Sequence, residues 1–398
     1  MRILQLCHKP PRPSKDGGCR AMDAMTRGMI QAGHHVKVLT IATDKHPWLP
    51  EELDEAYRSE TRIEAATLDT RLNRIDALSS IITGDSYNIN RFYAPAFEGL
   101  LIEALKREVF DLVIFESLFT APYLNAVRSY CDGPMVLRAH NVEHLIWEQL
   151  ARESSVLSKR IYLQHLADRL KAFEVNALQD FDAIVAITEE DKRHFESLGC
   201  LCPIFELPFG LDSEVIPPES SDQADHVFHL GSMDWRPNIQ GVEWFLDEVW
   251  SEVLNEVPTT ELRLAGRNFP ENSFSGAPRV SVLGEVSNAW EVMSASGVMI
   301  IPLQSGSGMR IKAIEAMAVG RPIVSTKIGI EGIGGKADVH YLIADDAAGF
   351  AKHVIHLLQN GSMAKRIGNE ARQLVFEKFE NNRLVRDLIG SLEQHFEL

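Results

Sequence analysis

The stretch IIPLQSGSGMRIKAIEAMAVGRPI, residues 300–323, contains a strand, a glycine-rich turn and a helix in immediate succession. The apolar run Gly297–Pro302 predicts a buried strand of a parallel sheet. A Gly/Ser turn over Gln304–Gly308 follows, and then a helix that ends at Gly320, because Pro322 blocks its continuation. Small residues at the carboxyl end of a strand let backbone N–H groups face an anion, and the helix N-terminus adds a favourable dipole. This order predicts a phosphate-binding unit in an α/β fold.

Three charged side chains accompany this helix. Arg310 and Lys312 lie in its first turn, where cations oppose the helix dipole but suit a bound phosphate. Glu315 lies one turn beyond Lys312, so a carboxylate stands beside the same turn. A diphosphate and a pair of sugar hydroxyls fit this set. The alternative is a solvated helix face with an i,i+3 ion pair, and the order of strand, glycine turn, cations and carboxylate favours the ligand site.

The helix also resembles a known motif. Retaining glycosyltransferases of family 4 carry Glu-Ala-Met-Ala-x-Gly-x-Pro-Val-Val at their donor site, and this chain is similar at Glu315, Ala316, Met317, Ala318, Gly320, Pro322, Ile323 and Val324. The resemblance implies the α/β fold called GT-B, in which two Rossmann-like doubly wound domains face each other across a cleft. It also implies that Glu315 binds the ribose hydroxyls of a nucleotide.

The same resemblance assigns the turn before the helix to the sugar donor. The family's first glutamate falls on Ser307 and is absent here. Many relatives carry Gly-x-Arg-x-Lys at this place, and Gly308, Arg310 and Lys312 resemble that variant. The resemblance thus implies donor contacts from Ser307, Gly308 and Met309. It implies a catalytic role for Arg310 and Lys312, which would neutralise the leaving diphosphate.

Length and composition indicate a soluble protein of two domains. At 398 residues the chain exceeds what one core usually organises. Its 45% hydrophobic and 24% charged residues are ordinary for a globular protein. The net charge of -16 argues against nucleic-acid binding. A local basic patch is still compatible with that charge, so peripheral contact with the inner membrane surface stays open, although no run approaches the roughly 18 to 20 apolar residues of a spanning helix.

The compartment is expected to be the cytoplasm. The first residues, MRILQLCHKPPRP, contain no long apolar segment and favour a first strand over a signal peptide. Five cysteines are too few and too scattered for a disulfide framework. Cys200 and Cys202 do not have the usual zinc-ligand spacing.

Both halves of the chain alternate strands with helices, which predicts two parallel sheets. In the first half, strands are expected at 3–7, 36–41, 112–115, 135–138 and 183–187, and helices at 19–32, 97–106 and over the long stretch 142–178. In the second half, strands are expected at 227–230, 261–265, 281–283, 298–301 and 323–325, and helices at 347–359, 363–378 and 381–396. The elements of 44–90 cannot be placed from their polar, mixed sequence.

A domain boundary is expected after Gly210. Leu207–Asp212 resembles the family's crossing into its second domain, and Pro217–Asp225 is polar like a linker. We expect an acceptor-side Rossmann-like domain over 1–210, a nucleotide-sugar domain over 211–380, and a C-terminal helix over 381–398. The resemblance implies that this helix packs back on the first domain, and we expect acceptor choice to lie in that domain as well, within 44–90.

Two strand ends of the first half carry further candidates. Gly17 and Gly18 follow the first strand, where relatives place a glycine-rich loop that contacts the donor diphosphate or the acceptor. A plain loop turn is the alternative. His140 follows the strand 135–138, and the resemblance places it beside the transferred sugar as a catalytic residue, the alternative being a structural histidine. His140 and His144 have i,i+4 spacing, but no clear third ligand supports a metal pair.

Two loops of the second half complete the set. Most relatives carry Arg and Lys as diphosphate ligands in the loop after the half's first strand, whereas Ser232 and either Pro237 or Asn238 stand there in this chain. This shift fits the transfer of that role to the cations of the later helix. Asn238 is alternatively the N-cap of the next helix. Val286 follows another strand and resembles the family loop whose backbone reads the nucleobase, although a plain strand-ending turn is the alternative.

The combined expectation is a metal-independent glycosyltransferase that moves a sugar from a nucleoside-diphosphate sugar to a glycan or lipid-linked glycan, in polysaccharide or cell-surface glycan biosynthesis. The resemblance implies that the transfer retains the anomeric configuration. The sugar nucleotide is a co-substrate, and no other cofactor is expected. Dinucleotide-like glycine patterns lack their third glycine, which argues against nicotinamide binding. A sugar-nucleotide epimerase of similar fold and a non-catalytic nucleotide-sugar-binding subunit are the alternatives, the latter because Ser307 replaces a family glutamate.

Overall fold

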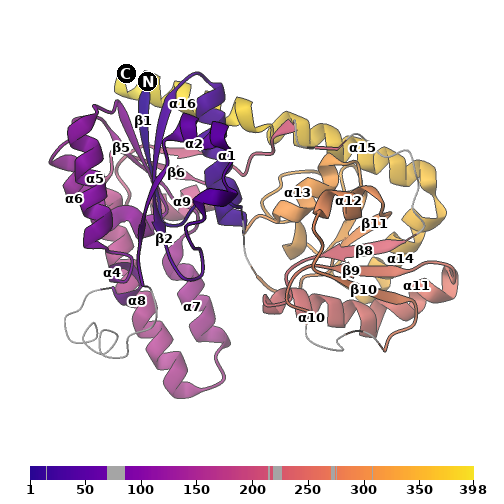
Figure 1. Ribbon diagram of the computed structural model, residues 1–398. Helices are drawn as coiled ribbons and strands as arrows, with labels where there is room; N and C mark the ends of the chain where they lie inside the picture. Colours follow the sequence, from indigo (N-terminus) through magenta and orange to yellow (C-terminus); the bar gives the residue numbers. More distant parts are fainter. Residues whose placement is uncertain are drawn as a thin grey trace. The chain divides into compact units, whose positions relative to one another are not determined.

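The chain forms two compact units, which are described separately. A computed structural model describes residues 1–14, 16–69, 86–213, 216–217, 226–269, 274, 276–306 and 308–398 (Figure 1). Unit 1 comprises residues 1–210 together with 381–398, and unit 2 comprises residues 211–380. No helix among these residues has both the length and the apolar character needed to cross a membrane.

Unit 1 is built on a seven-stranded parallel sheet with the strand order β3-β2-β1-β4-β5-β6-β7. Its strands are β1 (Arg2–Cys7), β2 (His35–Ala42), β3 (Glu64–Thr67), β4 (Leu112–Glu116), β5 (Met135–Arg138), β6 (Ala183–Ala186) and β7 (Ile204–Glu206). This is the order of a Rossmann domain, in which the chain reverses its direction across the sheet between β1 and β4. Ligands of such domains bind beyond the carboxyl ends of the strands at this switch point.

Helices cover both faces of this sheet. They are α1 (Gly17–Gln31), α2 (Glu55–Thr61), α4 (Tyr87–Asn90), α5 (Pro95–Arg107), α6 (Leu124–Arg128), α7 (Glu143–Glu153), α8 (Leu157–Asp180), α9 (Glu189–Ser197) and α16 (Asn381–Phe396), with 3₁₀ turns at Pro50–Glu52 and Leu118–Tyr123. Alternate strand residues enter separate cores, because successive side chains of a strand point to opposite faces. Leu6 and Phe115 lie in one core, and Ile3 and Ile114 lie in the other.

The C-terminal helix α16 belongs to unit 1 although it follows unit 2 in the sequence. Its Val385 and Leu388 are buried in the same core as Met22 of α1. At its start, the Asn381 side chain donates a hydrogen bond to the backbone oxygen of Ala24 over 2.8 Å. Apolar packing and a buried hydrogen bond therefore both hold the chain end on α1.

The long helical stretch expected over 142–178 is two helices, so that prediction was wrong in detail. The chain leaves helical geometry at Ser154, whose ψ is 120°, and α8 starts after Val156. Serine side chains compete for backbone hydrogen bonds, and the Ser154 hydroxyl donates to the backbone oxygen of Val156 over 3.4 Å. The result is a helical hairpin. The expectation also omitted β3, which lies in the unplaced stretch 44–90, and the short edge strands at Ile204–Glu206 and Leu342–Ile343.

Unit 2 repeats the same architecture with six parallel strands in the order β10-β9-β8-β11-β12-β13. Its strands are β8 (Val227–Leu230), β9 (Leu262–Ala265), β10 (Val280–Gly284), β11 (Val298–Ile301), β12 (Ile323–Ser325) and β13 (Leu342–Ile343). Its helices are α10 (Arg236–Trp244), α11 (Trp250–Glu256), α12 (Ala289–Ser294), α13 (Ile311–Ala318), α14 (Ala347–Gln359) and α15 (Gly361–Lys378), with a π-helical turn at Phe245–Val249 and a 3₁₀ turn at Ile328–Ile330. The switch point of this sheet lies between β8 and β11.

Candidate functional site

A buried glutamate organises the switch point of unit 1. Glu116 ends β4, and its carboxylate is fully buried. Three side chains donate to it: Gln5 of β1 over 2.8 Å, Arg138 of β5 over 3.1 Å, and Nε2 of His140 over 2.7 Å. Because β1, β4 and β5 are neighbours in a parallel sheet, their carboxyl ends bring these residues to one edge. His140 thus reaches the edge at which a ligand would bind.

The charge of Glu116 determines which nitrogen of His140 carries its proton. Burial alone would raise the pKa of Glu116, but the Arg138 charge and the hydrogen bonds from His140 and Gln5 outweigh it and lower the pKa to about 2. A carboxylate only accepts hydrogen bonds, so Nε2 of His140 must donate. Burial also lowers the pKa of His140, although Glu116 opposes this effect. The lowered pKa keeps the imidazole neutral at pH 7. Its Nδ1 therefore offers a lone pair to a ligand.

His8 is a second neutral imidazole at this edge, and it was not among the residues predicted from the sequence. Its Nδ1 lies 3.0 Å from the backbone oxygen of Glu116 and donates to it, which leaves Nε2 as an acceptor. Burial, together with the nearby His140 and Lys9, lowers the pKa of His8 to about 3, although its hydrogen bond to Glu116 opposes this. The two rings are 5.6 Å apart between centroids. The position of His8, directly after the first strand, was the signal that could have revealed it.

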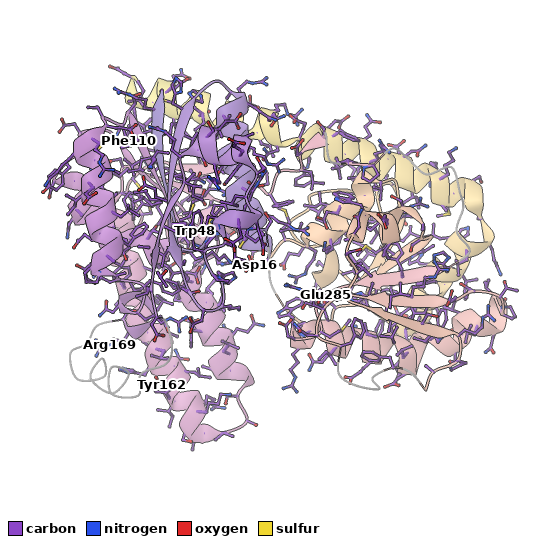
Figure 2. All side chains as sticks on the ribbon, in the orientation of Figure 1. Asp16, Trp48, Phe110, Tyr162, Arg169 and Glu285 are labelled. Carbon is purple, nitrogen blue, oxygen red and sulfur yellow. The ribbon has the colours of Figure 1, made fainter. Side chains whose placement is uncertain are left out.

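Gly17 and Gly18 open helix α1 beside this edge, next to a closed polar network. Asp16 (Figure 2) is the N-cap of α1 and accepts from the backbone N–H of Cys19 over 2.9 Å. Lys9 donates to both Asp16 oxygens over 2.8 Å, and a side chain at Gly18 would place Cβ 2.8 Å from the Lys9 ammonium. A side chain at position 18 would therefore displace the Lys9 ammonium. The Asp16 carboxylate caps the N–H of Cys19, and the Lys9 charge offsets it.

Asp16, Cys19 and His46 are arranged closely enough to suggest a metal site. One ligand atom from each lies within 4.8 Å of the other two. The Lys9 ammonium already donates to the Asp16 carboxylate, and the His46 ring lies 2.9 Å from it. Burial alone would raise the pKa of Asp16, but these hydrogen bonds hold it well below its usual range. Burial raises the pKa of the Cys19 thiol, which keeps it protonated at pH 7 unless a metal ion deprotonates it. The chemistry of this set favours a hydrogen-bonded cap over a metal centre.

A second buried carboxyl group follows His140 at the start of α7. Glu143 is 6% exposed, and burial, reinforced by the charge of Glu174, raises its pKa to about 7 although Asn141 donates to it. Glu174 of α8 accepts from the backbone N–H of Glu143 over 3.0 Å and lies 2.6 Å from Nδ1 of His144. His144 is thus a buried partner of Glu174. His140 and His144 thus have different carboxylate partners, Glu116 and Glu174.

Glu143→Gln is expected to make the protein more stable at alkaline pH. The pKa of Glu143 is raised on folding, so its stabilising contribution is complete below its unfolded pKa of about 4.5 and is lost as pH rises through about 7. Above that range wild type contains a buried carboxylate, and the substitution should recover about 3 kcal/mol of unfolding free energy. Urea denaturation from about pH 4.5 to about pH 8.5 measures this difference. Glu148→Gln, on the same helix but more exposed, is the control; an equal gain there would contradict the assignment.

In unit 2, the loops after β8 and β11 meet at the switch point. The Arg310 guanidinium lies 4.9 Å from the centre of the Trp235 ring. Gly306 has φ of 109°, and a Cβ there would lie 2.9 Å from Trp235, so the turn requires glycine. Burial lowers the pKa of Arg310 against the opposing charge of Glu331, yet an arginine remains charged at any physiological pH. The partly buried Arg310 guanidinium, packed on Trp235, therefore lies at the carboxyl edge of the unit 2 sheet.

The helix α13 presents the carboxylate and the second cation. The ammonium of Lys312 and the Glu315 carboxylate form an i,i+3 ion pair of 2.8 Å. The side chain of Lys312 is 32% exposed, whereas that of Glu315 is 4% exposed. The alternative interpretation of this helix was a solvated face with an i,i+3 ion pair. The ion pair is present, but the face is not solvated, because Glu315 is buried. Ala316, Met317 and Ala318 are fully buried, as a packing face requires.

The remaining candidates lie at the same edge or outside the described residues. Gly308 and Met309 lie in the turn before α13, and Gly308 has φ of 89°. Ser307 lies outside the described residues. Val286 follows β10 and Glu285 (Figure 2), two strands away from β8.

Asn238 is not an N-cap, which corrects the alternative given above. Helix α10 starts at Arg236 with Trp235 as its N-cap residue. The side chain of Asn238, inside the first turn, donates instead to the backbone oxygen of Ser232 over 2.9 Å. Pro237 supplies no N–H and fits an early helical position, so the helix can begin before the asparagine. Asn238 therefore fixes the loop after β8 from within the helix.

Comparison with protein families assigns the chain. A model described as Glycosyltransferase Family 4 matches residues 16–215, which is half of the chain. A second model, described as Glycosyl transferases group 1, matches residues 224–360. The chain belongs to glycosyltransferase family 4. The resemblance seen in the donor-site motif is thereby confirmed.

Known proteins are similar to this family 4 member in sequence or in fold. An uncharacterized 44.6 kDa protein in the cps region of Klebsiella pneumoniae is 27% identical over 294 residues, which cover 69% of this chain and 72% of the relative. Sucrose-phosphate synthase from Thermosynechococcus elongatus matches with a TM-score of 0.71 at 16% identity, over all of both chains. Anabaena HepE, solved in complex with UDP, matches with a TM-score of 0.66 at 13% identity, over 99% of this chain and 100% of HepE. The fold is α/β GT-B, as expected.

Proposed function

We propose that this family 4 glycosyltransferase transfers a sugar from a nucleoside-diphosphate sugar to a glycan or lipid-linked glycan, with retention of configuration and without a metal ion. The observation that carries the proposal is the βα unit of β11 and α13. It places a stacked Arg310 and the Lys312–Glu315 pair at the switch point of unit 2. HepE, of the same fold, was solved with UDP and with UDP-glucose, which supports a uridine or other nucleotide sugar as donor.

In this proposal α13 binds the nucleotide. Glu315 accepts hydrogen bonds from the ribose hydroxyls, since a buried carboxylate pairs strongly with two donors. Arg310 and Lys312 neutralise the diphosphate, and their effect grows as the glycosidic bond breaks and charge develops on the leaving group. Gly308 and Met309 would turn the backbone of their loop toward the donor, and Ser307, which stands where the family has its first glutamate, would contact the donor as well. Val286 would contact the base through its backbone.

Unit 1 would hold sugar hydroxyls. His140 and His8 are neutral and each offers one lone pair, so both suit a hydroxyl that donates a hydrogen bond. His140 would lie against the transferred sugar. Gly17 and Gly18 would contribute backbone N–H groups at the start of α1. Glu116 is unsuited to attack the sugar itself, because it is buried and saturated by three donors.

Metal independence rests on the supply of positive charge by side chains. Arg310 and Lys312 provide two cations where a metal-dependent enzyme would use a divalent ion. The one His/Cys/carboxylate group found among the described residues, at Asp16, already has Lys9 as its cation. A relative in a cps region supports a place in polysaccharide or cell-surface glycan biosynthesis, and a cytoplasmic location with peripheral membrane contact suits a lipid-linked acceptor.

A panel of radiolabelled UDP-, GDP- and other sugar nucleotides, incubated with the protein in EDTA, tests this proposal. Release of nucleoside diphosphate, with the sugar transferred to water or to an added glycan, is the expected result for at least one donor. The rate should be unchanged by chelation. Isomerised donor would instead indicate an epimerase, and binding without turnover a non-catalytic subunit. Activity lost in EDTA and restored by manganese or magnesium would contradict metal independence.

A further inference from the structure

The exposed apolar side chains of unit 1 gather on one helical hairpin. Fourteen large hydrophobic side chains are exposed in the described part of the chain, and six of them fall within residues 146–162. They are Ile146, Leu150, Val156, Leu157, Ile161 and Tyr162. Single exposed apolar residues are normal on a protein surface, but a concentration of this kind marks an interaction site. The hairpin tip, which we define as residues 150–162, contains five of the six.

The hairpin projects from the body of unit 1. Helices α7 and α8 run side by side beyond the end of the sheet, and Tyr162 lies in this projecting part (Figures 1 and 2). Ile146 and Leu150 are spaced i,i+4 on α7, and Leu157 and Ile161 are spaced i,i+4 on α8, so each helix carries an exposed apolar ridge. The inner residues Leu163 and Leu166 are buried. The hairpin is therefore held together by buried residues such as these, and the exposed apolar ridges are not needed for its packing.

The charge of the tip is opposite to that of the whole protein. The tip has three basic residues, Arg152, Lys159 and Arg160, against one acidic residue, Glu153, for a net charge of +2. The complete chain has 40 basic and 56 acidic residues. Lys159 and Arg160 are exposed beside Leu157 and Ile161. Aliphatic side chains flanked by cations and a tyrosine are the composition of elements that lie in the interface of an anionic bilayer.

We propose that the hairpin tip docks this protein on an anionic lipid surface. Leu150, Val156, Leu157 and Ile161 would enter the headgroup boundary, with Tyr162 at headgroup level. Lys159 and Arg160 would pair with lipid phosphates, since juxtamembrane cations are attracted to anionic leaflets. Neither helix crosses the membrane. A second copy of this chain is the less favourable occupant, because a two-fold contact between identical tips brings like charges together.

Docking here would place the sugar site near lipid. Helix α7 begins at Glu143, three residues after His140, so the hairpin is a direct extension of the edge that holds the two imidazoles. An acceptor linked to a lipid could then reach that edge without leaving the bilayer. The docking itself does not depend on sugar transfer, and its test measures no turnover.

The test is co-sedimentation of the full chain with vesicles of phosphatidylcholine alone and with about one-third phosphatidylglycerol. We expect binding to the anionic vesicles that weakens as salt is added. Leu157→Asp with Ile161→Asp should weaken this binding at least about tenfold, because it removes two inserted side chains and adds repelled charge. Both residues are more than 60% exposed, so folding should be kept, which circular dichroism verifies.

Leu201→Asp is the matched control, since Leu201 is 89% exposed in unit 1 but outside the hairpin. It should bind vesicles like wild type. Equal loss in the control, or no binding of wild type to anionic vesicles, would overturn the proposal. Sedimentation equilibrium tests self-association. If the wild-type protein is a dimer and the double variant is a monomer, the tip is a self-association surface instead.

Discussion

Lys312→Ala is expected to lower the turnover number by about 10²- to 10³-fold, the scale seen when one pre-placed charge at a developing anion is removed. Negative charge on the diphosphate grows as the glycosidic bond breaks, so the Lys312 ammonium acts mainly in the transition state. Donor affinity should fall less, because Arg310 remains and the ground-state diphosphate is partly screened by water. Steady-state kinetics with a donor identified from the panel, together with calorimetry, measures both quantities.

Two comparison variants separate this role from a structural one. Lys352→Ala removes an exposed lysine from α14 and should leave the turnover number unchanged. Glu315→Gln should instead weaken nucleotide binding by about 1 to 3 kcal/mol, the scale of a charged hydrogen bond. Since Lys312 is paired with buried Glu315, unfolding of the alanine variant must be checked before kinetics. A wild-type turnover number in folded Lys312→Ala would mean that α13 does not neutralise the leaving group.

The sequence predicted unit 2 well, because its signals are local. The strand, glycine turn and helix around Arg310 lie within 24 consecutive residues. Each is marked by its own hydrophobic pattern or by a residue that ends it, such as Gly320 and Pro322 for the helix. Burial of Glu315 was not predictable in this way. Helix periodicity shows which residues share a face with Lys312, but whether that face meets solvent depends on packing elsewhere in the domain. The stacking of Arg310 on Trp235 joins two loops 75 residues apart and likewise has no local signature.

The site in unit 1 was only partly predictable for the same reason. His140 was predicted from its place after a strand, but its partner Glu116 ends another strand, and a further donor to Glu116, Gln5, lies in a third. Such contacts depend on the strand order of the sheet, which the alternation of strands and helices does not specify. The raised pKa of Glu143 depends on burial under α8. The hairpin was missed because a break at two serines is too short to interrupt a helical period.

Glu116→Gln is expected to lower both stability and rate. The substitution leaves the Arg138 guanidinium, 2% exposed, without its carboxylate, and an uncompensated buried charge costs about 3 to 5 kcal/mol. It also removes the charge that makes Nε2 of His140 the donor, because a glutamine side chain can donate as well as accept. The turnover number should fall by about 10²-fold once the imidazole no longer holds its Nδ1 lone pair toward the sugar.

The double variant Glu116→Gln with Arg138→Met separates the two effects. Replacing both members of a buried ion pair is often close to neutral, so most of the lost unfolding free energy should return in urea denaturation. The rate should not return, since the tautomer of His140 is still unspecified. ¹⁵N chemical shifts of the His140 ring measure this directly: wild type should show the Nε2–H form, and both variants a mixture. If the double variant recovers stability and rate together, Glu116 serves only to balance Arg138; an Nδ1–H form in wild type would contradict the hydrogen-bond assignment itself.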